Sequence, residues 1–430
     1  MADKTVEGMN AELDIFSAPV AQKTILSGDW VQFKPTQAIN SESPLIFEIS
    51  GTGDRYIDTS RTLLNLKVRV LNGKNEPIGD TEKFAPACYL LCSAFNEAIV
   101  EYNQNIVSQC HGLYHMKSYW ESYFNFGTSA RESHLTAALF YQDLAGSYDD
   151  PDAGPAKKRA SFVRHGKTLE LMGRLHCDVL NTPQYLLNGV NIRLTLRRNP
   201  DALLFLAEDN LSPKLIIDDA TLYVRSVNLS PSILVAHAKI LHTKPSQYHY
   251  RRTEMLHYTV SQGTFQKSIE NILCGRTPIR IVMGLVKNSS FNGNYKENIF
   301  NFEHFNLNYL NLAINGATVG TKPLQPNYET GECMVPYVMG FFGSGICLAD
   351  DGNTISREDY SKSNAIYAWD LTPDVGASES HWSQPQNGGL RIELGFSKAL
   401  PTTVSLIILA EFRETLNIDY GRQCSLTYKG

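Results

Sequence analysis

Residues 64–70 read Leu-Asn-Leu-Lys-Val-Arg-Val, and Asn72-Gly73 stands just beyond them. Successive side chains of a strand point to opposite faces, so the apolar residues of this stretch share one face and the polar ones share the other. Asn-Gly is typical of a tight turn because both residues tolerate positive φ. The stretch therefore predicts a half-buried β-strand that ends in a tight turn.

This alternation is the dominant pattern of the chain. It recurs over residues 192–197, downstream of Asn188-Gly189, and strand-like sequence also covers 215–227. The 430 residues include 21 Tyr, 19 Phe, 30 Gly and 19 Pro. Aromatic residues favour strands, and Gly and Pro favour the turns between them. Together these features predict an all-β protein.

The second half of the chain repeats this order. A strand is predicted over 305–314, with a bulge where the alternation changes phase near Tyr309-Leu310, and Asn315-Gly316 follows it. Residues 390–396 alternate again, and the last strong strand covers 404–415. We match these three segments, in order, with 64–70, 192–197 and 215–227. Three matches in the same order predict a duplicated β-domain.

A short helix is predicted between the halves. Ser230 suits a helix cap, and Pro231 suits the first turn, where its missing N–H needs no partner. The residues at helical spacing that follow are Ile233, Leu234, His237, Ile240 and Leu241. A second helical region is predicted over 115–144, as an insertion in the first half.

Long polar loops complete the pattern, at 147–158, 322–332 and 349–363. Two sheets with long loops at their ends are typical of jelly rolls, so we predict two tandem eight-stranded jelly rolls, a double jelly roll. The predicted boundaries are an N-terminal arm (1–24), a first jelly roll (25–229), a helical linker (230–248) and a second jelly roll with a C-terminal tail (249–430).

Composition argues against several classes of protein. With 43% hydrophobic and 19% charged residues, the chain should fold. A net charge of −5 without a long basic block argues against a dedicated nucleic-acid binder. The N-terminus lacks the apolar core of a signal peptide, and the apolar stretches fall short of the ~18–20 residues that span a bilayer. We therefore expect a soluble protein made inside the cell, with no membrane span and with its eight cysteines as buried thiols.

The candidate metal-binding residues form no recognisable signature. His111 and His115 are four apart beside Cys110, but they lack the Glu of a His-Glu-x-x-His motif and nearby acidic ligands. We interpret them as a partly buried surface pair. Cys88 and Cys92 lack a second pair at zinc-ribbon spacing and are interpreted as core thiols. We expect no catalytic, cofactor-binding or metal-binding residues, no cofactor and no enzymatic activity.

Glycine-rich and basic segments also receive structural interpretations. Residues 340–345, Gly-Phe-Phe-Gly-Ser-Gly, lack the Lys-Ser/Thr of a phosphate loop and are interpreted as a flexible turn. No Gly-x-Ser-x-Gly elbow marks a nucleophile. The basic clusters at 157–159, 197–198 and 251–252 are interpreted as solvated surface or ion-pair partners, with nucleic-acid contact as the less favoured alternative.

Motifs early in the first predicted jelly roll resemble a known family. Residues 46–51 (Ile-Phe-Glu-Ile-Ser-Gly) and 56–62 (Tyr-Ile-Asp-Thr-Ser-Arg-Thr) lead into the strand at 64–70, and further likeness lies at 94–99 and 186–189. A tyrosine, aliphatic, aspartate, serine/threonine segment that opens a long strand is similar to what that family shows. With its two strand-rich halves and short connecting helix, the chain resembles double jelly-roll major capsid proteins of the Polinton/Maverick and adintovirus kind.

The resemblance implies a structural viral capsid protein. Its working unit would be a homotrimer of pseudo-hexagonal outline, because each of three subunits presents two similar domains. Such pseudo-hexameric capsomers would tile an icosahedral shell around double-stranded DNA, which they would contact only indirectly. A minor (penton) capsid protein is a candidate further partner. The protein would be made in the host cytoplasm and reside in the virion.

Two other jelly-roll functions stay open. A carbohydrate-binding module would use exposed aromatic residues in loops, for which Trp369 and Trp382 are candidates. A cupin-type enzyme would need clustered His and carboxylate ligands, which we cannot assemble from this sequence. We favour the capsid protein over the carbohydrate-binding module, and both over the enzyme.

Overall fold

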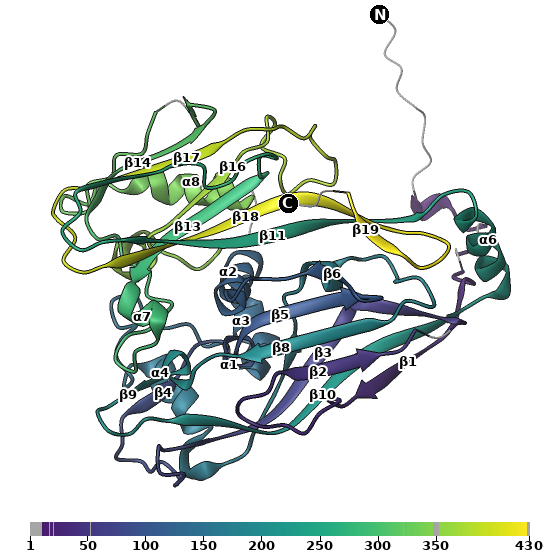
Figure 1. The fold of residues 1–430 in the computed structure, drawn as a ribbon, viewed down its shortest axis with the longest axis horizontal. Helices are drawn as coiled ribbons and strands as arrows, with labels where there is room; N and C mark the ends of the chain where they lie inside the picture. The colour runs from purple at the N-terminus through teal and green to yellow at the C-terminus, as the bar shows by residue number, and fades with distance from the viewer. Residues whose placement is uncertain are drawn as a thin grey trace, which may run out of the picture.

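The chain folds into two β-rich halves, which lie one above the other in Figure 1. The computed structural model of the protein describes residues 11–16, 18–19, 21–51, 53–320, 322–346 and 352–427. Antiparallel sheets hold the named strands of both halves together, which confirms the predicted all-β class. Half of the predicted N-terminal arm and part of the loop predicted over 349–363 lie outside the described residues.

The first half holds two four-stranded sheets. One has the strand order β1-β10-β3-β7 and the other β2-β8-β5-β6, while β4 and β9 form a separate pair. The strands are β1 (Ile25–Phe33), β2 (Leu45–Ile49), β3 (Arg55–Leu71), β4 (Phe84–Pro86), β5 (Phe95–Tyr102), β6 (Asn105–Ser108), β7 (Leu169–Arg174), β8 (Ile192–Arg198), β9 (Phe205–Ala207) and β10 (Lys214–Leu229).

The second half has the sheets β11-β18-β13-β16 and β12-β17-β14-β15, and β19 pairs with β18. The strands are β11 (Ser246–Val260), β12 (Gln266–Ile269), β13 (Arg280–Lys287), β14 (Leu307–Ile314), β15 (Ala317–Thr318), β16 (Ile366–Asp370), β17 (Leu390–Phe396), β18 (Val404–Ile418) and β19 (Cys424–Leu426). The register between β14 and β17 shifts between Leu307 and Tyr309, which confirms the predicted bulge.

The two halves share one topology. We number the eight strands of each pair of main sheets along the chain, leaving out β4, β9 and β19. Both halves then read 1-8-3-6 in one sheet and 2-7-4-5 in the other. Eight antiparallel strands in two facing sheets make a jelly roll, so the predicted duplication into two jelly rolls is confirmed.

Two of the three matched strand pairs are correct. Strands β8 and β17 are both seventh in their halves, and β10 and β18 are both eighth. The match between 64–70 and 305–314 is wrong, because the former lies in the third strand, β3, and the latter in the fourth, β14. Both strands are followed by Asn-Gly, and this turn signal does not identify the strand that precedes it.

The counterpart of Asn315-Gly316 is Asn103-Gln104. Each dipeptide joins the fourth strand to the fifth, and all four residues have positive φ, as a two-residue I′ hairpin requires. The chain also turns at Asn72-Gly73, but neither residue there has positive φ. Instead the Asn72 side chain accepts hydrogen bonds from the N–H groups of Lys74 and Glu76, each at 2.9 Å. The place of this turn was predicted correctly and its conformation was not.

Helices occupy the long connections. Those between β6 and β7 confirm the insertion predicted over 115–144, and α4 and α9 lie partly or wholly in the loops predicted over 147–158 and 349–363. No helix in the described ranges has the length and apolar character needed to cross a bilayer.

The α-helices are α1 (Leu90–Ser93), α2 (Tyr114–Asn125), α3 (Thr128–Arg131), α4 (Gly154–Ser161), α5 (Asp201–Leu204), α6 (Pro231–Leu241), α7 (Asn288–Asn292), α8 (Met334–Ser344) and α9 (Arg357–Ser363). The 3-10 helices are η1 (Ala11–Leu13), η2 (His134–Ala138), η3 (Arg164–Gly166) and η4 (Asp178–Asn181).

Helix α6 confirms the helix predicted between the halves. The Ser230 side chain does not cap it, because its hydroxyl instead pairs with that of Ser232 at 2.7 Å. The predicted apolar stripe is only partly covered, with Leu241 buried and Ile240 47% exposed. Strand β11 begins at Ser246, inside the range predicted for the linker.

One hydrophobic core runs through both halves. Val282, Val286, Ile407 and Leu409 of the second half belong to the same buried cluster as the core of the first half, and a second cluster fills the second sandwich. Strands β13 and β18 are therefore buried on both faces, whereas β3 exposes Lys67 between buried residues. We call β11-β18-β13-β16 the covered sheet and β1-β10-β3-β7 the open sheet.

Candidate functional site at the seam between the halves

The seam is the region where the connection between β6 and β7 packs against the covered sheet. On α2, the ring of Tyr119 stacks on that of Phe300 with 4.1 Å between centroids, and Trp120 lies 5.2 Å from Phe302. Gly284 of β13 lies beneath Phe302, and a Cβ at that glycine would come within 2.7 Å of the phenyl ring. Because Gly284 has no side chain, the aromatic rings can approach the covered sheet closely.

A buried charge cluster lies beside these rings. Lys117 of α2 is fully buried and pairs with Asp178 of η4, while its Nζ lies 3.6 Å from a Glu121 oxygen. The other Asp178 oxygen accepts the N–H of Thr253 in β11 at 3.0 Å, so the cluster joins the two halves. Burial alone would lower the pKa of Lys117, but the two carboxylates outweigh it and raise this pKa well above its usual value.

His176 extends this cluster toward the first half. Its Nδ1 lies 2.7 Å from Glu121, and its Nε2 lies 2.8 Å from the Tyr89 hydroxyl and 3.2 Å from that of Ser122. Burial alone would raise the pKa of Glu121, yet Lys117 and His176 together lower it below its usual value. The charges of the cluster are thus satisfied by one another.

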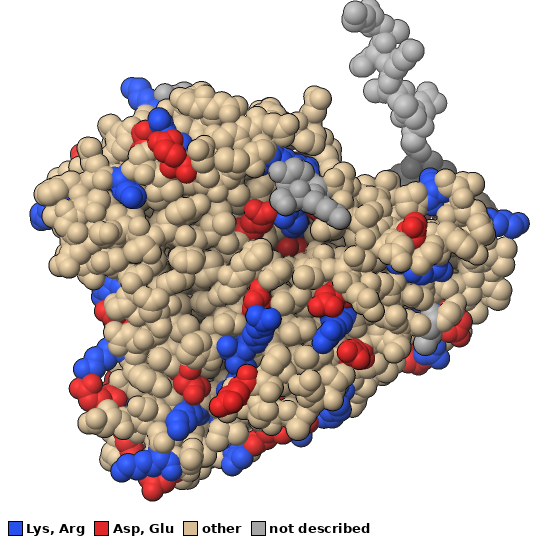
Figure 2. Space-filling model, in the orientation of Figure 1, with Lys and Arg blue, Asp and Glu red and all other residues tan. Residues whose placement is uncertain are grey.

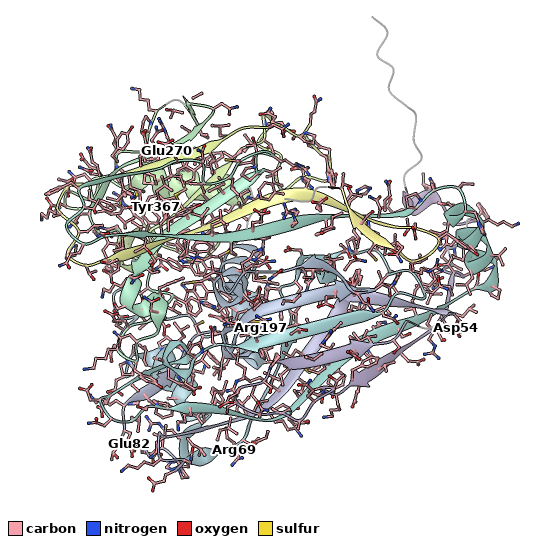
Figure 3. All side chains as sticks on the ribbon, in the orientation of Figure 1. Asp54, Arg69, Glu82, Arg197, Glu270 and Tyr367 are labelled. Atoms are coloured by element: carbon pink, nitrogen blue, oxygen red, sulfur yellow. The ribbon has the colours of Figure 1, made fainter. Side chains whose placement is uncertain are left out.

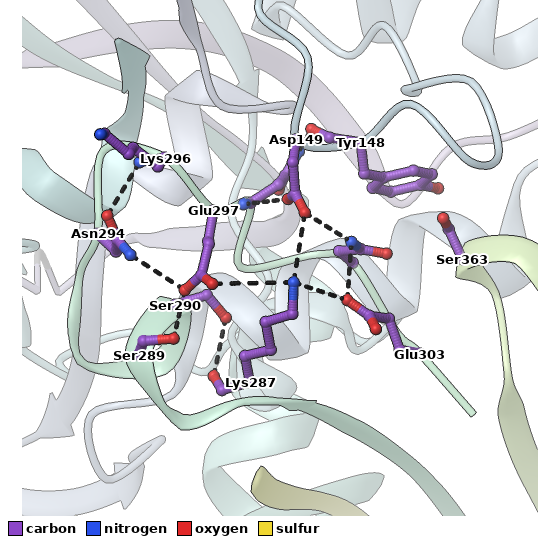
Figure 4. Close-up of polar contacts among 12 residues, drawn as sticks. Tyr148, Asp149, Lys287, Ser289, Ser290, Asn294, Lys296, Glu297, Glu303 and Ser363 are labelled. Carbon is purple, nitrogen blue, oxygen red and sulfur yellow. Dashed lines mark hydrogen bonds and ion pairs between the residues drawn. The ribbon is translucent and has the colours of Figure 1, made fainter. Parts of the chain in front are cut away.

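A second, half-buried cluster surrounds Lys287 at the end of β13 (Figure 4). The Lys287 ammonium lies 3.1 Å from Glu303, 3.7 Å from Asp149 and 3.8 Å from Glu297. Asp149 belongs to the first half and also accepts the N–H of Asn298 at 2.7 Å. This cluster is a second polar link across the seam.

Hydrogen bonds to residues on either side of α9 form a third link across the seam. The hydroxyls of Tyr123 and Tyr148 both donate to Asn364 Oδ1 at 3.0 Å, and Arg131 donates to the carbonyl of Asn353 at 3.0 Å. Apolar, ionic and hydrogen-bonded contacts therefore hold the two halves as one unit. These groups bind one another across an interface, and such an arrangement suits a structural contact better than a substrate pocket.

Comparison with known proteins identifies a relative that matches along almost the whole chain. No family model matches the chain. An uncharacterized protein of Caenorhabditis elegans is 22% identical over 422 residues, which make up 94% of this chain and 98% of that protein. The likeness therefore spans both halves.

Solved structures of similar fold come from viruses. The cryo-EM structure of the Sputnik virophage matches with a TM-score of 0.64 at 12% identity, over 98% of this chain and 93% of that one. The Faustovirus major capsid protein matches with a TM-score of 0.53 at 9% identity, over 94% and 92%. The mavirus major capsid protein matches with a TM-score of 0.51 at 9% identity, over 98% and 95%. The fold is a double jelly roll.

The double jelly roll separates the candidate metal ligands. His115 is buried on α2 while His111 is exposed in the turn before it, so the interpretation as a surface pair is wrong for His115. Burial raises the pKa of Cys88 and of Cys92 to about 12, which agrees with their interpretation as core thiols. The described residues contain no group of three or more His, Cys, Asp or Glu that could hold a metal ion.

Of the remaining cysteines that the structure describes, all but one are buried. Cys274 is exposed, so the expectation of buried thiols is wrong for this residue. Cys347 lies outside the described residues. The burial of the others follows from their positions in packed parts of the double jelly roll.

Residues 340–344, predicted as part of a flexible turn, belong to α8. A Cβ at Gly343 would lie 2.4 Å from the carbonyl of Ala368 in β16, so this glycine permits close packing of helix on strand. Gly345, at a φ of 83°, ends the helix in the left-handed conformation. The glycines here serve helix packing and helix termination.

The basic clusters are engaged in ion pairs. Arg159 is buried and lies 2.6 Å from Asp143, and Arg197, labelled in Figure 3, lies 3.9 Å from Glu97. Arg252 pairs with Glu254. On the face drawn in Figure 2, basic and acidic side chains are interspersed. These contacts confirm the ion-pair interpretation for one arginine in each cluster.

The two candidate tryptophans have different surroundings. Trp369 is buried in β16, so its interpretation as an exposed loop residue is wrong. Trp382 is 39% exposed, lies under the Arg413 guanidinium at 5.7 Å and lines a pocket of about 370 Å³ at the seam.

Sequence reasoning missed the seam cluster. The spacing of Lys117 and Glu121, four residues apart in a predicted helical region, could have indicated a pair on one helix face. Nothing in the sequence connects that pair to Asp178 or to Thr253. Their contact depends on how the two jelly rolls pack together.

Proposed function

We propose that this chain is the major capsid protein of a virus, or of a virus-derived element carried in an animal genome. The observation that carries the proposal is the pair of identically connected jelly rolls. They share one hydrophobic core and together make up almost the whole chain. The similarity of fold to the Sputnik virophage structure and to the major capsid proteins of mavirus and Faustovirus, each over more than nine-tenths of this chain, supports it. The full-length nematode relative supports the animal-genome alternative.

The working unit we propose is a homotrimer that assembles into an icosahedral shell around double-stranded DNA. Two similar jelly rolls per chain give six similar units in a trimer, and head-to-tail contacts between unlike surfaces can close at three. A minor (penton) capsid protein would complete the shell. The protein would be made in the host cytoplasm and reside in the virion. The first jelly roll would span residues 25–229, and the second would begin with β11 at Ser246, three residues before the predicted boundary at 249. Helix α6 would be the linker, and residues 1–24 would be an arm ordered by neighbouring subunits.

Assembly of the purified full-length protein tests this proposal. We expect light scattering at micromolar concentration to give three chains per particle or much larger assemblies, and electron microscopy to show hexagonal capsomers or shells. A monomer at every salt concentration and pH, with no shells, would refute it. Binding to glycans by such a monomer, lost on Trp382→Ala, would favour the carbohydrate-binding module instead.

We also propose that the protein has no enzymatic activity and no bound metal. Residues of the basic and glycine-rich segments make structural contacts, as described above. Elemental analysis of the purified protein should find well below one metal ion per chain. About one equivalent of zinc or iron would refute this part of the proposal without affecting the fold.

A further inference from the structure

The seam joins two surfaces, and each has a counterpart elsewhere in the chain. The first surface is the connection between the fifth and sixth strands of the first jelly roll, which carries α2. Its counterpart in the second jelly roll is the connection between β15 and β16, which carries α8. The second surface is the covered sheet, and its counterpart is the open sheet. Among the described residues, α8 makes no hydrogen bond, ion pair or ring contact with the open sheet.

Helix α8 presents an apolar face to solvent. Val335 is 65% exposed, and Val338, Met339 and Phe342 are each more than 40% exposed. On α2, by contrast, the aromatic residues of the seam are buried. A pocket of about 720 Å³ lies beside α8 and is lined by Val335, Met339 and Phe342 among others. An exposed apolar helix next to an apolar pocket is typical of a surface that binds another protein.

The open sheet carries an exposed aromatic residue within a polar surface. Trp30 of β1 is 45% exposed, and the guanidinium of Arg225 in β10 lies 5.9 Å from its ring. The ion pair between Arg69 and Asp218 lies on the same sheet. In Figure 3, Arg69 lies on the side of the first half that faces away from the second half. This face is thus available to another molecule.

We propose that the apolar face of α8 docks on the open sheet of a second copy of this chain, around Trp30. This inference rests on the trimer of the proposed function and names the surfaces that form it. The seam is the precedent, because there the corresponding connection already packs on the corresponding sheet. A chain that carries two unlike, complementary surfaces forms a head-to-tail contact, which can close into a ring. Because the open sheet is more polar than the covered sheet, the contact between chains would be less apolar than the seam.

A charge on α8 tests the proposal against a matched control. Val335→Glu places a carboxylate on the exposed α8 face, and Val235→Glu does the same on α6, where the valine is 55% exposed. Both side chains are exposed, so both variants should fold like the wild type by circular dichroism. We expect Val335→Glu to raise the dissociation constant of the trimer by about tenfold or more in sedimentation analysis. Val235→Glu should leave this constant unchanged.

Mixing two defective variants tests the head-to-tail geometry. Val335→Glu keeps an intact open sheet, and Trp30→Ala keeps an intact α8. Each variant alone should be mainly monomeric, and an equimolar mixture should contain heterodimers held by the one intact contact. If Val335→Glu trimerises as tightly as the wild type, the docking surface is wrong while the trimer stands. If the mixture yields no heterodimers, the pairing of α8 with the open sheet is wrong. If the wild type itself stays monomeric, the proposed function fails and this inference fails with it.

Discussion

Replacing Lys117 with methionine removes the ammonium that the buried Asp178 and the half-buried Glu121 share at the seam. The side chain is fully buried, and it contacts Asp178 and Glu121. Removing one partner of a buried ion pair leaves uncompensated charge, which costs about 3–5 kcal/mol. Since the free energy of unfolding of a domain is about 5–15 kcal/mol, Lys117→Met should shift urea unfolding, followed by circular dichroism, to much lower concentrations.

This penalty should depend on pH. Lys117 helps to hold the pKa of Glu121 below its usual value, so without it burial should raise the pKa of that carboxyl. A group whose folded-state pKa lies above its unfolded value stabilises the fold as pH falls, so the deficit of the variant should shrink as pH falls from neutrality toward the usual pKa of a glutamate. Arg69→Met, which opens an exposed ion pair, is the matched control and should leave the unfolding midpoint almost unchanged. Equal midpoints for Lys117→Met and Arg69→Met would refute the account of the seam given above.

Three further outcomes follow from particular residues. Gly284→Ala should destabilise the protein by about 1–3 kcal/mol in urea unfolding, because its Cβ would clash with a phenyl ring, whereas Gly53→Ala has open space and should have little effect. Burial lowers the pKa of His115 to about 4. Between about pH 6.5 and about pH 4, this histidine therefore binds a proton in the unfolded chain but not in the folded chain. As pH falls over this range, the free energy of unfolding of the wild type should therefore decrease by about 3 kcal/mol more than that of His115→Leu. Parallel pH profiles for the two proteins would contradict this prediction. Iodoacetamide should label the exposed Cys274 before Cys88 in the folded protein, as mass spectrometry of peptides can determine, and the reverse order would refute the burial assigned to these thiols.

The predictable part of this fold lies in strands with one face in solvent. Around residues 64–70 the alternation of side chains marks the strand directly, because each face has a different environment. Strand β13, Arg-Ile-Val-Met-Gly-Leu-Val-Lys, has no such alternation because it is buried on both faces. It was accordingly not among the predicted strands, and its absence contributed to the wrong match between β3 and β14. Recognising β13 requires knowing that another part of the chain covers it.

The candidate site was less predictable for a related reason. Residue type alone was enough to select Trp382, Cys88 and the basic clusters as candidates. The role of each of these residues depends instead on its burial and on partners that are distant in the sequence. Arg159 is buried against Asp143, although the two lysines that precede it, Lys157 and Lys158, are exposed. The seam itself is built from common residues without a motif. Its existence follows from the packing of two jelly rolls, which local patterns do not encode.

The covered sheet also has a consequence for the order of synthesis on the ribosome. Its outward apolar residues, such as Val282 and Leu409, would face water in a second jelly roll made alone. The first jelly roll leaves the ribosome earlier, so its helices are already in place when β13 and β18 emerge. A circularly permuted chain that began at Ser246 would reverse this order. The apolar outer face of its covered sheet would then be exposed to water during translation. With the halves in their natural order, we expect the outward apolar face of the covered sheet to be exposed for less of translation than in the permuted chain.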